Sequence, residues 1–392
     1  MAVVNTADIR SMNKKNIIQA VRSGQPATKK AIADGLGLSF ATVSNLCNQL
    51  IEEGILKIAS SENSSGGRIP GLISLEPGSR GSLCLDLNQP EHVNASLLNL
   101  QNETLDSVTA AIPSGQGLTE RLQVCYEVAM QLLDRQQMSY EHLLGVGAAI
   151  PGIFYKKNNT VINSTIPIFE NQPVKKLLED RFQLPVYLEN ESNILALATS
   201  TRLQLNSGER QEVAYIYIAE GLGVGITHQG AIFGGNRGFG GEVSHMPLGS
   251  NRYSCYCGQE GCVETELSLF GFWKSYSGTA VQAPSDSLAS FWKEFVEAAQ
   301  SGEERARQVL GDKGRLLGKL ISVITNLFDP DEVYVGGMVE PIFPFMYPYL
   351  LEEATSRVIT KDFYFPAIKS GGDYEETMHQ GCAEMVFKFW SP

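Results

Sequence analysis

The sequence contains no hydrophobic run long enough to cross a membrane. No run approaches the roughly 18 apolar residues that a bilayer requires. The first residues, MAVVNTADIRSMNKKN, also lack the apolar segment of a secretory signal peptide. We therefore expect a cytoplasmic location. With 392 residues, 43% of them hydrophobic, the chain is long enough for two or three domains that each have a core.

Cysteine is sparse, and a disulfide framework is not expected in a reducing compartment. Of the seven cysteines, Cys47, Cys84, Cys125 and Cys382 stand alone in apolar surroundings, which is typical of buried thiols. The other three lie within the eight residues CYCGQEGC at positions 255 to 262. Such a group could form a disulfide knot, a structural metal site or a catalytic site.

Positive charge is also in short supply, because the chain has a formal net charge of −12. Residues 1–80 are the exception, with nine Lys and Arg against six Asp and Glu, whereas the other 312 residues have 22 against 37. A head of net charge +3 on a body of −15 suits a DNA-binding module joined to a domain that avoids DNA.

The first eighty residues predict three helices followed by a two-stranded wing. Apolar residues recur at helical spacing in residues 13–24, 27–37 and 39–54, and the third segment begins at Ser39, a good N-cap. Residues 55–59 and 72–75 have the pattern of strands, and the Ser/Gly-rich segment between them would form the wing tip. This order predicts a winged helix-turn-helix. The alternative is a three-helix packing unit with a solvated loop.

Several side chains of the third helix stand outside its apolar stripe and could reach base edges in a major groove. An arginine on a flexible glycine-rich tip suits a phosphate or a narrow minor groove. The candidate DNA contacts are Phe40, Thr42, Ser44, Asn45, Asn48 and Arg68.

From about residue 81 onward, short β-rich runs alternate with amphipathic helical segments, which predicts an α/β architecture. No G-x-G-x-x-G motif opens a helix after the first strand, so a dinucleotide-binding fold is not favoured. We predict two domains, a DNA-binding domain of residues 1–80 and a second domain of residues 81–392.

The three clustered cysteines gain a possible fourth partner in the histidine upstream of them. One imidazole and three thiolates suit tetrahedral zinc, and two glycines in the segment allow the chain to turn tightly around one ion. Four protein ligands leave no open position, which predicts a structural rather than a hydrolytic site. A chance group of buried thiols is the alternative. The candidate ligands are His245, Cys255, Cys257 and Cys262.

These motifs resemble the ROK family, which contains bacterial sugar kinases and sugar-responsive repressors. The resemblance is carried by GEVSHMPL with CYCGQEGCVE, by IAEGLGVGI with GGNRGFGGE, and by AAIPGIF, LENESN and NLFDPDEVYVGG. The head is similar to that of the family's repressors, including SSGGRIP at the wing. The resemblance implies an actin-like (ribonuclease H-like), two-lobed sugar-kinase fold with a sugar in the cleft.

The resemblance also implies which side chains bind the effector. His245 would use one ring nitrogen for zinc and present the other to the sugar. Glu191 falls where the family's kinases place an aspartate that acts as general base. For each carboxylate the alternative is a solvated loop residue, which we accept only for Glu266. The implied effector-binding set is Asn190, Glu191, Glu242, His245 and Glu264.

Two departures from the family's kinases predict a protein that is not an enzyme. The kinases hold ATP phosphates on a hairpin, Asp-x-Gly-Gly-Thr, whereas here Asp86 is followed by Asn88-Gln89-Pro90. Without glycine the backbone cannot approach phosphates closely. Glu191 is one methylene longer than aspartate, and a base misplaced by about 1 Å is costly in rate.

The predicted function is therefore a sugar-responsive transcriptional repressor whose effector is a sugar or a sugar phosphate. We expect a homodimer or a dimer of dimers, with recognition helices roughly 34 Å apart on a pseudo-palindromic operator. Two other functions remain open. One is a sugar kinase with an added DNA-binding head and weak residual activity, and the other is a regulator whose effector is a protein.

Overall fold

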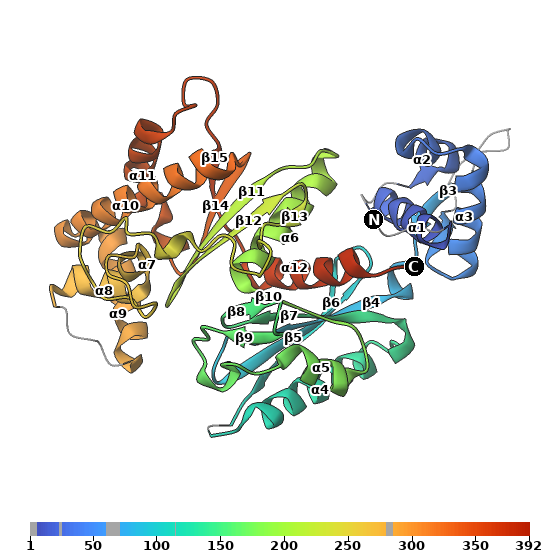
Figure 1. The fold of residues 1–392 in the computed structure, drawn as a ribbon, viewed down its shortest axis with the longest axis horizontal. Helices are drawn as coiled ribbons and strands as arrows, with labels where there is room; N and C mark the ends of the chain where they lie inside the picture. The colour runs from blue at the N-terminus through green and yellow to red at the C-terminus, as the bar shows by residue number, and fades with distance from the viewer. Residues whose placement is uncertain (1–5, 23–25, 60–70, 114, 280–284) are drawn as a thin grey trace.

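The protein consists of a small head and two larger lobes (Figure 1). The computed structural model describes residues 6–22, 26–59, 71–113, 115–279 and 285–392. The candidate contact Arg68 at the wing tip lies outside the described residues.

The head has the helix-turn-helix order that the sequence predicts. Its core is formed by buried apolar residues of the three helices and the sheet, such as Ile17, Val43 and Ile73. Ser39 caps the third helix, since its hydroxyl accepts a hydrogen bond from the Thr42 N–H at 3.1 Å. The elements are α1 (Thr6–Arg22), β1 (Ala27–Thr28), α2 (Lys29–Leu36), α3 (Phe40–Glu52), β2 (Leu56–Ala59) and β3 (Leu72–Leu75), and the sheet order is β1-β3-β2.

The first lobe is a five-stranded sheet of order β10-β7-β4-β5-β6. Strands β4, β5 and β6 form an antiparallel meander, and β7 and β10 run parallel to β4. Helices α4 (Leu118–Arg135) and α5 (Val174–Phe182) cover one face. The strands are β4 (Gly81–Asp86), β5 (His92–Asn99), β6 (Thr104–Ala111), β7 (Leu143–Ile150) and β10 (Val186–Asn190), and β8 (Ile153–Tyr155) pairs separately with β9 (Thr160–Ile162).

The second lobe repeats this topology, with sheet order β13-β12-β11-β14-β15. The apolar run at residues 213–226 makes two antiparallel strands, because the chain reverses at Ala219–Gly221. The strands are β11 (Val213–Ile218), β12 (Leu222–His228), β13 (Ala231–Ile232), β14 (Glu332–Gly337) and β15 (Ala367–Ser370). The helices are α7 (Glu264–Leu267), α8 (Leu269–Ser277), α9 (Ser285–Ser301), α10 (Glu304–Phe328) and α11 (Phe343–Arg357).

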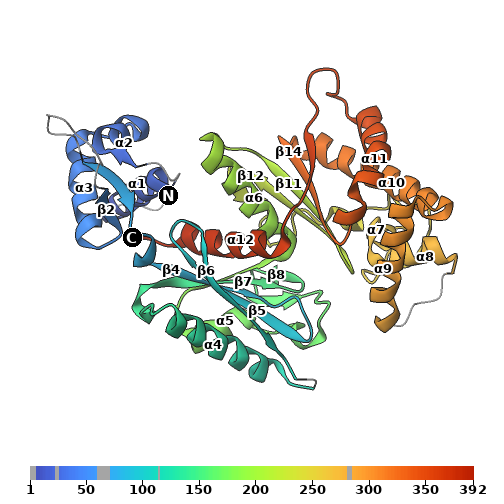
Figure 2. The same ribbon diagram turned by 180° about the vertical axis from the view of Figure 1, so that it is seen from behind.

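Two helices, α6 (Glu191–Ser207) and α12 (Tyr374–Phe389), lie between the two sheets (Figure 1, Figure 2). The packing of α12 against β7 and against α6 requires their backbones to lie close together. A Cβ at Gly147 of β7 would stand 2.3 Å from the Cys382 carbonyl oxygen of α12, and a Cβ at Gly381 would stand 2.4 Å from the Ile194 carbonyl oxygen of α6. Glycine at both places lets α12 pack tightly between the first sheet and α6.

The head contacts the body through the end of α12 (Figure 2). Arg22 of α1 is buried and forms an ion pair with Glu384 of α12, with Nη1 2.9 Å from Oε2. Its guanidinium also stacks over the Phe387 ring at 4.0 Å and donates to the Leu100 carbonyl. The apolar core of the head includes residues of the body, Leu100 and Phe387 among them, so the two parts share a packed interface.

In the part of the chain that the structure describes, no helix is both long and apolar enough to span a membrane.

Candidate functional site: a cleft beside a metal centre

A polar cavity of about 260 Å³ lies between the two lobes. Its walls are the ends of β7 and β10, the first turn of α6, the turn between β11 and β12, and the segment that leads into the cysteine cluster. Among the predicted effector-binding residues, Asn190, Glu191, Glu242 and Glu264 line this cavity, and they come from segments up to 74 residues apart.

Asn190 and Glu191 are placed by the junction of β10 and α6. Asn190 is the N-cap of α6, and its Oδ1 accepts from the Ser192 N–H at 2.9 Å and from the Ser192 hydroxyl at 2.6 Å. Its Nδ2 donates to the Gly152 carbonyl at 3.3 Å. Glu191 therefore begins the helix with its carboxyl group at the cavity wall.

Glu191 belongs to a buried acidic cluster that crosses from one lobe to the other. The hydroxyl of Tyr374, the first residue of α12, lies 3.0 Å from Glu191 Oε2 and 3.1 Å from Asp86 Oδ2. Two carboxylates that share one hydroxyl proton repel each other, which favours a proton on one of the acids. Burial, and then the Asp86 charge, raises the pKa of Glu191 to about 8, so Glu191 is that acid at neutral pH.

Two more carboxylates face the cavity on the side of the second lobe. Desolvation between the cleft walls, and then the Glu189 charge, raises the pKa of Glu242. Burial, with a smaller contribution from Glu242, raises the pKa of Glu264 to about 7. Glu189, which directly precedes Asn190, was not among the predicted site residues.

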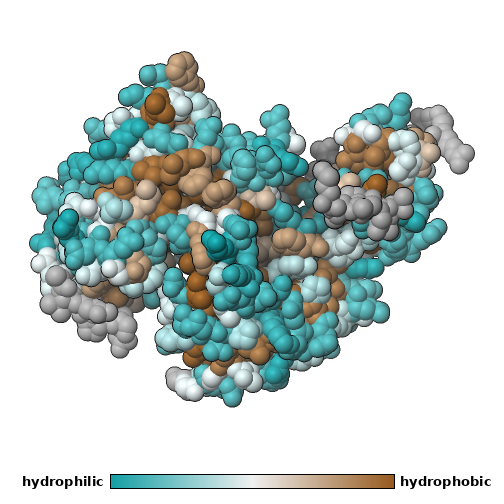
Figure 3. Space-filling model, viewed as in Figure 1, coloured by the Kyte–Doolittle hydropathy of each residue, from teal (hydrophilic) through white to brown (hydrophobic). Residues whose placement is uncertain are grey.

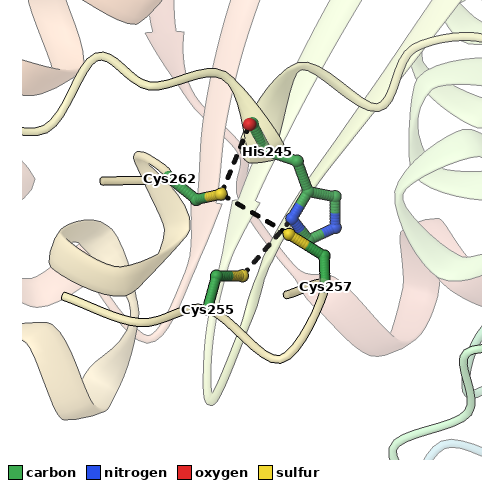
Figure 4. A group of neighbouring side chains, drawn as sticks. All are labelled: His245, Cys255, Cys257 and Cys262. Atoms are coloured by element: carbon green, nitrogen blue, oxygen red, sulfur yellow. Dashed lines mark hydrogen bonds between the residues drawn. The ribbon is translucent and has the colours of Figure 1, made fainter. Parts of the chain in front are cut away.

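Next to the cavity, the four predicted metal ligands converge (Figure 4). Their ligand atoms all lie within 4.8 Å of one another. His245 Nδ1 is 3.6 Å from Cys255 Sγ, and Cys257 Sγ is 3.6 Å from Cys262 Sγ. Two sulfur ligands at about 2.3 Å from a tetrahedral ion would lie about 3.8 Å apart, so these spacings fit a metal ion.

The other nitrogen of His245 does not open onto the cavity. His245 Nε2 lies 3.3 Å from the hydroxyl of Tyr256, and it is Tyr256 that lines the cavity. The expectation that His245 presents Nε2 directly to a sugar therefore remains a prediction that requires Tyr256 to move. Tyr256 stands between two metal ligands in CYC, and that position was the only sequence signal for it.

Comparison with known proteins agrees with this geometry. The ROK family profile matches residues 90–384, three quarters of the chain. The chain belongs to the ROK family. It is 25% identical over 386 residues to the "Xylose repressor" of Caldicellulosiruptor bescii, with 96% of each chain covered. It is 26% identical over 347 residues to the "DNA-binding transcriptional dual regulator NagC" of Escherichia coli, covering 84% of this chain and 81% of that protein.

Two solved ROK structures differ in how much of this chain they match. A ROK family transcriptional regulator, described as a homologue of E. coli MLC protein, matches 97% of this chain and 99% of its own, with a TM-score of 0.77 and 18% identity. The ROK hexokinase of Thermus thermophilus matches 78% of this chain and 97% of its own, with a TM-score of 0.64 and 23% identity. The fold of the whole chain is thus that of a ROK regulator, and most of it is also that of a ROK kinase.

In this ROK protein the segment after β4 has a conformation unlike an open phosphate loop. Asp86 Oδ1 accepts from both the N–H and the side-chain amide of Asn88, at 3.0 and 2.8 Å, and Oδ2 contacts Tyr374. The carbonyls of Gln89 and Pro90 accept from the guanidinium of Arg121, which is only 1% exposed. Both oxygens of Asp86 are therefore engaged by the protein itself.

One expectation about this region was wrong. Glu266 is not a solvated loop residue, because it is 4% exposed in α7. Its Oε1 accepts from the Asn251 N–H at 2.8 Å, and its Oε2 lies 4.0 Å from Lys313 Nζ of α10. Glu266 therefore ties the loop before the cysteine cluster to the core of the second lobe. Sequence reasoning missed this because Lys313 is 47 residues away.

The predicted DNA contacts lie on α3, where the structure describes them. Phe40 is 58% exposed, and Asn45 and Asn48 are also exposed. Thr42 and Ser44 are half-buried. Asn48 Oδ1 accepts from Lys29 Nζ at 2.6 Å, so a lysine of α2 stands beside the polar face of α3. These residues remain candidates for base contacts.

Replacing Cys257 by serine is expected to abolish tight metal binding, because the set loses one of its three sulfur ligands. Metal content measured by mass spectrometry and the melting temperature should fall together. Gln259→Ala, an exposed change in the same loop, is the control and should keep both. A Cys257→Ser protein with native melting temperature and no metal in either form would contradict the metal site.

Replacing Glu191 by glutamine is expected to change how stability depends on pH. The folded-state pKa of Glu191 is raised, so its favourable contribution is complete below about pH 4.5 and is lost as pH rises to about 8. Urea unfolding at pH 5, 7 and 9 should therefore show Glu191→Gln gaining up to about 5 kcal/mol of unfolding free energy over the native protein at pH 9 and little at pH 5. Glu141→Gln, at an exposed site, is the control. If the free energy of unfolding depended on pH in the same way for the native and the Glu191→Gln proteins, Glu191 would ionise normally.

Proposed function

We propose that this protein is a sugar-responsive transcriptional repressor that acts in the cytoplasm, binding operator DNA with its head and a sugar between its lobes. The observation that carries the proposal is that one helix, α12, contacts both sites. Its first residue, Tyr374, bonds to the cleft cluster, and Glu384 and Phe387 near its end hold Arg22 of the head. The relatives named xylose repressor and NagC support the same function.

In this proposal the sugar changes the head through α12. The two lobes meet at Tyr374, which α12 brings from the second lobe to Asp86 and Glu191 of the first. A sugar that binds Glu191 competes for or reinforces these contacts, so it favours one position of α12 over another. A ligand can shift an equilibrium only by such a difference in affinity between two arrangements.

We assign zinc to the cluster of His245 and the three cysteines. The donor set of one imidazole and three thiols is that of a structural zinc site, and it leaves no open coordination position. When bound, zinc supplies a fixed cross-link with no redox chemistry of its own. The chain's own contribution is to set the loop that carries Tyr256 and Glu264 against the cavity, with Glu266 holding the loop to the second lobe.

The kinase alternative is opposed by the segment after β4. Phosphoryl transfer requires a loop that binds phosphates and a metal bridge between them. Here Arg121 holds the carbonyls of residues 89 and 90, which fixes the path of a segment without glycine, and Asp86 is occupied by Asn88 and Tyr374. Glu191, at the position of the base, retains its proton at neutral pH. These three features support a binding protein without enzymatic activity.

A homodimer is part of the proposal, because paired heads read the two halves of a palindrome. Exposed apolar side chains gather where α10 ends beside the segment between α11 and β15, including Leu327 (61% exposed), Ile359 (84%) and Phe363 (93%). Figure 3 shows apolar residues on this lobe among a largely polar surface. A second copy of the chain would cover such residues.

The test is operator binding by the full chain and by Glu242→Ala, using DNA selected in vitro by the native protein. Glu242→Ala should bind the DNA normally, with two chains on each palindrome, and should no longer release it when the effector sugar is added. Glu260→Ala, on the exposed part of the cysteine loop, is the control and should respond like the native protein. Loss of DNA affinity in Glu242→Ala would mean that the cleft has a structural role only.

Coupling through α12 is tested by Tyr374→Phe, which removes one hydroxyl and keeps the ring. The variant should bind sugar with an affinity close to native but need about tenfold more sugar to release the operator. Tyr140→Phe removes a hydroxyl that bonds to the Phe182 carbonyl within the first lobe, and is the matched control. If Tyr374→Phe releases operator at the native sugar concentration, coupling does not pass through this contact.

A further inference from the structure

The wall of the cavity is acidic. Glu191, Glu220, Glu242 and Glu264 line it, and among the residues that the structure describes no lysine or arginine does. The lysine that lies near is Lys156, whose Nζ packs against Gly234 and whose charge acts on Glu189. The cavity therefore has no cationic side chain to offer an anionic ligand.

Three backbone N–H groups at the cavity that could take the place of a cation already have partners. A phosphate can also bind to N–H groups at the start of a helix or in a glycine loop. At the start of α6 the Ser192 N–H is taken by Asn190, and the first helical residue is itself an acid, Glu191. In the turn after β11 the Leu222 N–H donates to Glu264, and in the glycine segment the Gly240 N–H donates to the Gly234 carbonyl.

The carboxylates already repel one another. Glu242 and Glu264 line the same cavity, and burial, followed by the charge of the neighbouring Glu189, raises the pKa of Glu242. A phosphate monoester carries a charge of about −1.5 to −2 at pH 7. Placing it among these groups would add repulsion that no partner offsets.

Hydroxyl groups are matched to this wall. A carboxylate accepts hydrogen bonds and donates none when ionised, whereas a sugar hydroxyl can donate one and accept others. Glu242 and Glu264 therefore provide acceptors, and the hydroxyl of Tyr256 provides a donor that needs no charge on the ligand.

We propose that the cavity binds a neutral, unphosphorylated sugar and excludes sugar phosphates. The proposal rests on the sugar-sensing function above and narrows it. It separates two effector classes that the sequence left open, since a repressor of this fold could respond either to an incoming sugar or to its phosphorylated product.

The test uses the full-length protein in isothermal titration and thermal-shift experiments with matched pairs of ligands. The probes are D-glucose with glucose 6-phosphate, N-acetyl-D-glucosamine with its 6-phosphate, and D-xylose. For any pair in which one member binds, the neutral sugar should bind at least about tenfold tighter than its phosphate. The difference in affinity between the two ligands should decrease as ionic strength rises, because salt screens the repulsion between the phosphate and the carboxylates.

A charge variant separates electrostatics from shape. Glu220 is exposed at the cavity wall. Glu220→Gln should reduce the discrimination between a sugar and its phosphate by about twofold, as expected for one charge at a distance in water. Glu141→Gln lies at the opposite end of β7 from the cavity and is the control with the same change of charge.

The outcomes are distinct. Tighter binding of a sugar phosphate than of its neutral partner overturns the inference and leaves the sugar-sensing function standing. If neither salt nor Glu220→Gln changes the ratio of the affinities for a sugar and its phosphate, the electrostatic cause is overturned. If D-xylose and both pairs fail to bind or to release operator DNA, the sugar-sensing function fails and the inference fails with it.

Discussion

The structure depends on the packing of α12 between the first sheet and α6. At Gly147 and Gly381 the backbones are so close that even a methyl group would overlap a carbonyl oxygen. Because α12 begins at the cleft and ends at the head, a rigid fit in the middle makes its two ends move together. A loosely packed helix could not transmit a displacement. A close-packed protein interior has low compressibility and therefore transmits strain.

The ends of α12 differ in chemistry, and that difference suits a switch. At the head, the Arg22–Glu384 pair is buried and also satisfied by a carbonyl and an aromatic ring, so it holds the helix firmly. At the cleft, Tyr374 shares its hydroxyl between two acids, an arrangement that one proton or one ligand hydroxyl can change. The adjustable contact thus lies at the wall of the cavity proposed to bind the sugar.

The candidate metal ligands and Glu266 explain how a long loop can form a precise wall. The segment from residue 233 to residue 263 has little regular structure, yet it carries Glu242 and Tyr256 to the cavity. Four ligand atoms within 4.8 Å and the Glu266–Asn251 hydrogen bond fix this segment to the second lobe. Binding specificity can therefore reside in a loop without the cost of ordering it for each ligand.

Local patterns in the sequence determined the helices of the head, the Ser39 cap, the α/β body and the grouping of His245 with three cysteines. Each depends on residues close in the chain, where periodicity, capping and ligand spacing act directly. The tertiary structure alone decided that Tyr374 joins Asp86 and Glu191, that Glu266 is buried with Lys313, and that Tyr256 covers His245. Except for Tyr256, these partners are 47 to 288 residues apart, and no local pattern marks them. Tyr374 meets the two acids because two sheets pack around α6 and α12, and Glu266 meets Lys313 because α7 packs against α10, neither of which short-range propensities specify.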